Sequence, residues 1–155
     1  MIDDIDRQLL DILQRDARTS NAELARRVGM AASATLERVR KLEQQGVIAG
    51  YAARLDAGQL GAGLLAFVFV RTEDAGVAAE DTEAKLAALP EVQEVHHVAG
   101  EDCFLLKVRA ADTASLGRLL RERIGAIPTV RSTRTTIVLQ TVKDVTTLVV
   151  AAPDA

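Results

Sequence analysis

The sequence predicts an α+β protein in which a (winged) helix-turn-helix domain is followed by a ferredoxin-like βαββαβ sandwich. Two observations predict this fold class: apolar residues recur with helical spacing over the first fifty residues, and after Gly50 β-favouring runs alternate with two helical stretches. With 155 residues, 48% of them hydrophobic, the chain can form two small packed cores. The predicted domains are 1–50 for the helix-turn-helix, 51–62 for a strand and linker, 63–143 for the sandwich, and 144–155 for a tail that can add an edge strand.

Helical spacing indicates two helices in the first thirty residues. The first carries one apolar stripe that includes Ile5 and Leu9, with acidic residues crowding its first turns, where they favour the positive end of the helix dipole. The second is expected to begin after Ser20, with Glu23 three residues later as a capping box, and to end at Gly29. It would bury Leu24, Ala25 and Val28.

A third helix is predicted from about Ala32 to Gln45, with Leu36, Val39 and Leu42 buried. Three helices with a short glycine turn before the last are typical of a helix-turn-helix, whose last helix enters the DNA major groove. Its outward face, calculated at about 100° per residue with Val39 inward, is partly cationic. The alternative is an ordinary solvated helix face. The residues expected to contact DNA are Ser33, Ala34, Thr35, Glu37, Arg38 and Lys41, together with Arg18 and Arg40.

The formal net charge of −3 argues weakly against a nucleic-acid partner, but the charge is unevenly distributed. Residues 1–17 contain two basic and five acidic side chains, whereas residues 18–41 contain six basic and two acidic ones. Charges act over a Debye length of about 8–10 Å, so the local balance matters more than the sum. The predicted recognition helix therefore lies in a basic stretch of an acidic chain.

After residue 50 the pattern predicts a split βαβ arrangement. The run at 64–70 is apolar throughout, which indicates a strand buried largely on both faces. A short strand is also expected at 51–55. The remaining predicted elements are a helix at 78–89, strands at 91–98 and 103–108, a helix capped by Asp112 that ends near residue 124, and a strand at 129–140.

Residue types and spacing argue against an enzyme, a metal site and a membrane protein. Cys103 is the only cysteine, so a reducing cytoplasm is expected, and a small core residue is favoured over a reactive thiol. His96 and His97 are adjacent on a predicted strand and cannot share a metal ion. The longest apolar run has seven residues, against about 20 for a membrane span. We expect no metal and no cofactor; an enzyme that uses His96 or Cys103 is the alternative.

Four segments of the first half are DDIDR at 3–7, RTSNAELA at 18–25, LERVRKLE at 36–43 and GVIAGY at 46–51. In the second half, VAG at 98–100, FLLKV at 104–108 and the stretch from 133 to 143 join them. Together these segments resemble the Lrp/AsnC, or feast/famine, family of transcription regulators, and the leucine-responsive branch most closely. One departure is Ala31-Ala32, where the family usually has Ser, often followed by Pro. The helix cap then passes to Ser33 or is lost, at a cost of roughly 0.5–2 kcal/mol.

The resemblance implies that the second domain binds an amino acid and assembles the chain. The family's Gly-x-x-Asp loop reads Gly100-Glu101-Asp102-Cys103, with cysteine at the usual aspartate position. Either acidic residue could accept hydrogen bonds from a ligand ammonium, and backbone N–H groups near Gly100 could bind its carboxylate. The alternative is a polar hairpin turn without a ligand. The predicted effector-binding residues are Gly100, Glu101, Asp102, Cys103, Thr133 and Thr135.

The sequence therefore predicts a sequence-specific DNA-binding transcriptional regulator that responds to a small amino acid. By the same resemblance we expect a homodimer that assembles into a higher oligomer, an octamer, on double-stranded operator DNA. The alternative function is a small-molecule-sensing module whose helical domain docks on a protein partner and not on DNA.

Overall fold

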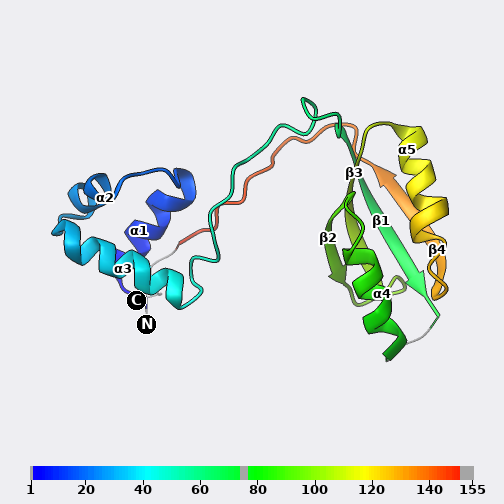
Figure 1. Ribbon diagram of the computed structural model, residues 1–155, viewed down its shortest axis with the longest axis horizontal. Helices are drawn as coiled ribbons and strands as arrows, with labels where there is room; N and C mark the ends of the chain where they lie inside the picture. Colours follow the sequence, from blue (N-terminus) through cyan, green and yellow to red (C-terminus); the bar gives the residue numbers. More distant parts are fainter. Residues whose placement is uncertain (1, 74–76, 151–155) are drawn as a thin grey trace. The chain divides into compact units, whose positions relative to one another are not determined.

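The computed structural model describes residues 2–73 and 77–150, which form two compact units (Figure 1). The helical unit contains the residues up to Arg54 and the segment from Lys143 onward. The sheet unit contains residues 55–142. Each unit has its own hydrophobic core, so each is described by itself.

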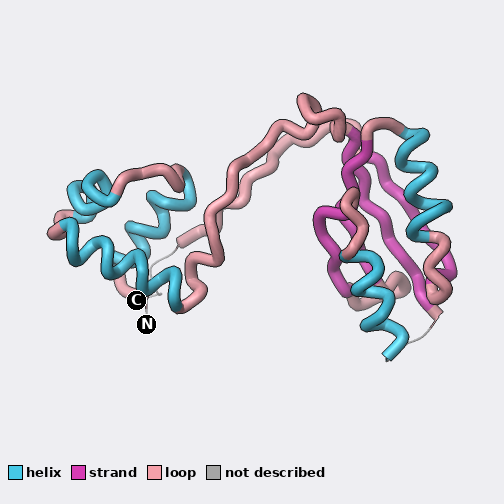
Figure 2. Tube along the Cα trace, in the orientation of Figure 1, coloured by secondary structure: helices cyan, strands magenta, loops and turns pink. Residues whose placement is uncertain are grey.

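The helical unit consists of three helices, α1 (Asp4–Arg15), α2 (Asn21–Val28) and α3 (Ala32–Gln44), as Figure 2 shows. Its core gathers one or two side chains from each helix. Leu24, Ala25 and Val28 are buried, as predicted for α2. The buried apolar members of the core are Leu9, Leu13, Leu24, Val28 and Val39.

Side-chain caps begin the first two helices, and a glycine ends the second. Asp3 and Asp6 form a reciprocal capping box at the start of α1, which was not predicted from the sequence. The Ser20 hydroxyl accepts a hydrogen bond from the Glu23 amide, as predicted. Gly29 adopts the left-handed conformation at φ +69°, where a side chain would be strained. The helix-turn-helix geometry thus follows from local signals.

No strand occurs in the described residues outside the sheet unit, which corrects three expectations. The helix-turn-helix has no wing, residues 51–55 form no strand, and the tail at 144–150 adds no edge strand. A strand requires a neighbouring backbone that continues a hydrogen-bond ladder. The tail is instead held by side chains, because Gln14 bonds to the backbone of Leu148 and Arg54 to the carbonyl of Asp144.

The sheet unit confirms the predicted ferredoxin-like order of elements. Its four strands are β1 (Leu64–Thr72), β2 (Val92–His97), β3 (Phe104–Ala110) and β4 (Val130–Ile137). They form an antiparallel sheet in the order β2-β3-β1-β4. The helices α4 (Val77–Ala87) and α5 (Thr113–Arg118) connect the strands, and a π-helix at Leu119–Ile124 continues α5.

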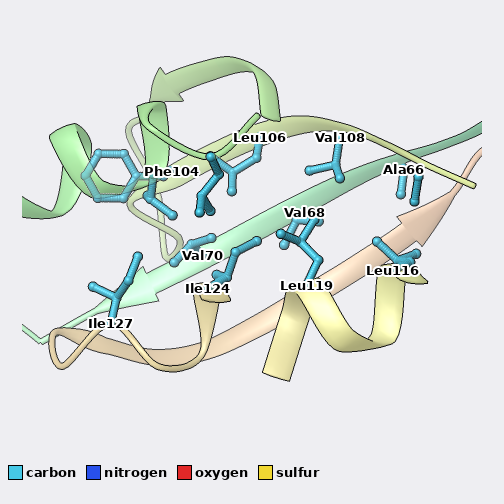
Figure 3. Close-up of a cluster of buried hydrophobic side chains, with 13 residues drawn as sticks. Ala66, Val68, Val70, Phe104, Leu106, Val108, Leu116, Leu119, Ile124 and Ile127 are labelled. Atoms are coloured by element: carbon cyan, nitrogen blue, oxygen red, sulfur yellow. The ribbon is translucent and has the colours of Figure 1, made fainter. Parts of the chain in front are cut away.

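Both helices pack on one face of the sheet, and Figure 3 shows hydrophobic core residues that lie between this face and the helical layer. Val68 and Val70 of β1 and Leu106 of β3 are fully buried there, against Leu119 and other helix side chains. On the opposite face, the β1 aromatics are only half-buried. Within one chain, therefore, the expectation that 64–70 is buried largely on both faces is not met, because helices cover one side only.

We predict that Ala31→Ser increases the stability of the helical unit. Ala31 occupies the N-cap of α3 and offers no side-chain hydrogen bond, whereas a serine hydroxyl there can accept one from an amide of the first turn. The expected gain in the free energy of unfolding is about 1 kcal/mol, measured by urea denaturation. Ala32→Ser is the matched control, since the first helical residue is past the cap. Equal effects of the two substitutions would contradict the capping explanation.

Candidate nucleic-acid interface

The buried side of α3 is formed by Thr35, Val39 and Leu42. These positions advance by four and three residues, so at about 100° per residue they point the same way. Leu36, expected in the core, is 37% exposed instead. The buried side is centred nearer Thr35 than predicted, which changes the set of residues that face outward.

The structure contradicts the prediction that Thr35 contacts DNA. Its side chain is fully buried, and its hydroxyl donates a hydrogen bond to the carbonyl of Ala31 at 3.1 Å. A threonine hydroxyl satisfied inside the first helical turn is unavailable to a base edge. Thr35 therefore belongs to the packing of α3 against the other helices.

The outward side of α3 carries Ser33, Glu37, Arg40 and Lys41, all exposed, whereas Ala34 at its edge is half-buried. Arg18 is exposed in the turn between α1 and α2. Within residues 2–73 and 77–150, the guanidinium groups of Arg18 and Arg40 and the ammonium group of Lys41 make no ion pair. These cations are thus available to phosphates.

Arg38 is held inside the helical unit by the capping box of α1. Its Nη1 atom donates to Asp3 Oδ2 at 2.6 Å and to Asp6 Oδ1 at 2.8 Å. Each carboxylate uses its other oxygen to cap α1, so each aspartate joins two elements. The Asp6 amide and the Arg38 guanidinium lower the pKa of Asp3, and the two carboxylates raise the pKa of Arg38. Arg38 therefore positions α3 on α1.

A second acid holds two cations of α2. Glu23 accepts hydrogen bonds from Arg26 Nε at 2.8 Å and from Arg27 Nε at 2.6 Å. The Arg26 and then the Arg27 hydrogen bonds lower the pKa of Glu23 to about 2. Both arginines are consequently partnered, although their side chains are exposed.

The joint between α2 and α3 is tied by one side chain. Asn21 Nδ2 donates to the carbonyl of Ala32 at 2.8 Å, which joins the first residue of α2 to the first residue of α3. The bond spans the turn that contains Gly29. The angle between the two helices is thereby set by Asn21 and by the left-handed glycine together.

The loop between β2 and β3, the predicted effector loop, has its acids in contact with arginines of neighbouring strands. Asp102 accepts from Arg134 Nη2 of β4 at 2.9 Å. Arg71 of β1 donates its Nε to the carbonyl of Glu101 at 3.0 Å. The Arg134 guanidinium also lies 4.0 Å from the centre of the Phe69 ring. Carboxylates and guanidinium groups are thus adjacent at one end of the sheet.

The other predicted effector residues do not close around this loop. Gly100 has φ +148°, and the space beside its Cα is open. The Cys103 amide donates to the Val70 carbonyl of β1, and Thr133 pairs with Val70 from the other side. Neighbouring strands lie about 4.8 Å apart, so Thr133 is about 10 Å from the loop, and Thr135 lies two residues further along β4. The residues of one chain form an open site.

The histidines do not form a catalytic or metal centre. His96 contacts Glu94, whereas His97 contacts Glu83 and stacks on Phe104 at 4.9 Å between ring centres. Their cross-strand pairing places them on opposite faces of the sheet, as predicted. Among the described residues, no group of three metal-ligating side chains occurs. None of the helices in the described part of the chain is long and apolar enough to span a membrane.

Comparison with family models identifies both halves of the chain. The AsnC-type helix-turn-helix domain matches residues 2–43, and the Lrp/AsnC ligand binding domain matches residues 65–148. The leucine-responsive regulatory protein of Salmonella typhimurium is 43% identical over 150 residues, which cover 96% of this chain and 92% of the relative. The sequence similarity therefore extends through both units.

Solved structures agree with these matches. A transcriptional regulator from Neisseria meningitidis in complex with L-methionine is 30% identical, with a TM-score of 0.91 and 96% of each chain covered. A feast or famine regulatory protein from M. tuberculosis complexed with L-methionine is 40% identical, with a TM-score of 0.85 and 93% and 96% covered. The similarity thus holds for the arrangement of the elements as well as for the sequence.

We predict that Glu23→Gln removes one source of pH-dependent stability. The folded-state pKa of Glu23 is about 2, below its ordinary value of 4.5. A lowered carboxyl pKa stabilises the folded protein above pH 4.5, and this stabilisation disappears as the pH falls from 4.5 towards 2. Wild type should therefore melt above the variant at pH 7 and together with it near pH 2, as thermal unfolding measures.

Glu37→Gln is the matched control for this experiment, because Glu37 is exposed on α3 and makes no ion pair with any described residue. Its melting temperature should stay near that of wild type at every pH. A Glu23→Gln difference that persists unchanged at pH 2 would refute the role of the carboxylate.

Proposed function

Because the chain belongs to the Lrp/AsnC family and is a DNA-binding transcriptional regulator, we propose specific residues and a mechanism for its DNA and effector binding. The outward side of α3 reads the operator in the major groove, and the sheet unit binds a small amino acid. The observation that carries the DNA assignment is a pair of exposed cations, Arg40 and Lys41, which make no ion pair with any described residue and lie on the side of α3 opposite its buried residues.

On this proposal each residue of α3 has a chemical role. Ser33 and Ala34, in the first turn, allow close approach of the helix to the base edges, and Glu37 can accept a hydrogen bond from cytosine. Arg40 and Lys41 bind guanine or phosphate oxygens, and Arg18 adds a phosphate contact from the preceding turn. Arg38 acts indirectly, through the position of the helix.

The uncovered face of the sheet supports assembly of two copies. Phe67 and Phe69 of β1 and Leu105 of β3 lie on the face that no helix covers, and each is only half-buried. Contiguous apolar side chains on a sheet face favour burial against another surface. We therefore propose a homodimer formed through this face. Its two-fold symmetry would present two recognition helices to half-sites about one helical turn apart.

Assembly of dimers into an octamer is proposed to complete the effector site. A second copy would close the open site around the loop, because one chain leaves the Cys103 end of the loop and Thr133 about 10 Å apart. Asp102 and Glu101 would bind the ligand ammonium, and the loop amides or the neighbouring Arg134 would bind its carboxylate. Cys103 and Thr135 would border the site.

Effector binding would then change DNA geometry by shifting the assembly. A ligand that binds an interface between dimers stabilises the assembled state and couples to DNA with about 1–3 kcal/mol. Several dimers on one operator also add affinity through effective concentration. The lone cysteine, which forms no internal disulfide, suits a cytoplasmic location. The alternative, docking of the helical unit on a protein partner, has only the net negative charge of the chain in its favour.

We predict that Arg40→Gln and Lys41→Gln weaken operator binding without destabilising the fold. Each removes a cation that makes no ion pair with any described residue, so a phosphate contact is lost while the core stays intact. The plot of log K against log [salt] should become less steep, by about 1 unit of slope for each phosphate-contacting cation that is removed. A mobility-shift titration against salt, with duplex DNA from the upstream region of its own gene, measures this.

Arg38→Gln is the contrasting variant in the same titration. It leaves Asp3 and Asp6 without their shared cation, so the urea midpoint should fall while the salt slope stays unchanged. If the Arg40 and Lys41 variants keep the wild-type slope and affinity, the assignment of the outward side of α3 is wrong.

We predict that a specific amino acid raises the melting temperature. Binding to the folded state alone stabilises it by about 2.7 kcal/mol when the ligand is at 100 times its Kd. L-Leucine and L-methionine are tested first, and 4-methylpentanoate is the control, since it lacks the ammonium of leucine. Asp102→Asn should abolish the shift, whereas Glu83→Gln should retain it. Equal shifts with leucine and 4-methylpentanoate would exclude ammonium recognition by this loop.

A further inference from the structure

The C-terminal segment is docked on the helical unit by hydrogen bonds to its backbone. Gln14 of α1 uses its side-chain amide as a peptide group: Nε2 donates to the Leu148 carbonyl at 2.9 Å, and Oε1 accepts from the Leu148 amide at 2.8 Å. Asp11 Oδ1 also accepts from Nε2, at 3.3 Å, and so orients the amide. One glutamine therefore satisfies both polar groups of a tail residue.

A second backbone contact holds the same segment nearer its start. Arg54 Nη2 donates to the carbonyl of Asp144 at 2.9 Å. Contacts to backbone atoms depend on the path of the chain and only weakly on its side chains. The side chain of Leu148 is 78% exposed, which agrees with docking through the backbone.

The docked segment also forms one wall of an apolar cavity of about 480 Å³ inside the helical unit. Leu10 and Leu13 of α1, with Ile48 from the segment after α3, form the opposite walls. Thr146 and Leu148 belong to the tail wall. The tail therefore lies beside apolar surface of the unit, while the side chain of Leu148 stays exposed and the Gln14 hydrogen bonds hold its backbone.

We propose that the segment 144–150 is a strap that tethers the helical unit a second time, and that Gln14 is the positioning residue that holds it. The helical unit is joined to the sheet unit through the linker after Arg54, which contains Gly58 and Gly61. The strap is the continuation of the chain beyond β4, so its docking attaches the same unit through a second segment of chain, in addition to the linker before β1. This inference rests on the proposed function.

The consequence for DNA binding follows from effective concentration. A single linker with several glycines lets a bound unit sample a large volume, which lowers the effective concentration of the second recognition helix at its half-site. A second tether reduces that volume without changing any contact to DNA. The strap should therefore strengthen binding to an operator with two half-sites and leave binding to one half-site unchanged.

The strap contact is tested by hydrogen exchange of the Leu148 amide in the full-length protein. In Gln14→Ala this amide loses its acceptor and should exchange about fivefold faster than in wild type. Gln14→Glu keeps an acceptor for the amide and loses the donor to the carbonyl, so it should give a smaller acceleration. Gln8→Ala is the matched control, because Gln8 is exposed on the same helix and makes no hydrogen bond with any described residue.

The function of the strap is tested with two duplexes. One is selected by the wild-type protein from a random-sequence pool, and the other is the same duplex with one half-site scrambled. Gln14→Ala should bind the intact duplex roughly tenfold more weakly, and the scrambled duplex within about twofold of wild type. Gln8→Ala should match wild type on both.

Three results would overturn the proposal. These are an unchanged exchange rate of Leu148 in Gln14→Ala, an unchanged affinity for the intact duplex, or an equal loss on both duplexes, which would indicate a structural defect of the helical unit. Failure of the proposed function gives a distinguishable result, since the wild-type protein would then select no duplex at all.

Discussion

Burial of one side of α3 is the constraint on which the rest of the helical unit depends. Thr35, Val39 and Leu42 are the buried residues of α3, and Val39 packs in one core with residues of the other two helices, so this burial determines the orientation of the outward residues of α3. Arg38 reinforces it with two hydrogen bonds to the start of α1. Because the core is small, such polar contacts matter more than they would in a large domain.

An acidic chain can bind DNA because its acids are used locally. Asp3 and Asp6 hold Arg38, and Glu23 holds Arg26 and Arg27. In these ion pairs the acidic side chains are neutralised by neighbouring arginines. The cations Arg40 and Lys41 remain on the outward side of α3. Screening limits each charge to its neighbourhood, so the sign of the total is a poor guide to the partner.

The two faces of the sheet differ in burial. Helices bury Val68, Val70 and Leu106 on one face, whereas Phe67 and Phe69 on the other face stay half-buried and form the proposed dimer surface. The proposed effector loop lies at the end of this sheet, where strands from three parts of the chain bring acids and arginines together. On the proposed function, effector binding and assembly would influence each other through the same strands.

The sequence by itself determined the elements and their order, because helix periodicity, the Ser20 cap, Gly29 and the alternation of strands and helices are local signals. Apolar patterning also identified most of the core. Only the tertiary structure decided the buried side of α3, the pairing of Arg38 with Asp3 and Asp6, and the docking of the tail on Gln14. Those features join residues 32 to 134 positions apart. Periodicity within one segment carries no information about which distant partner satisfies a polar group, and packing against that partner sets the rotation of a helix.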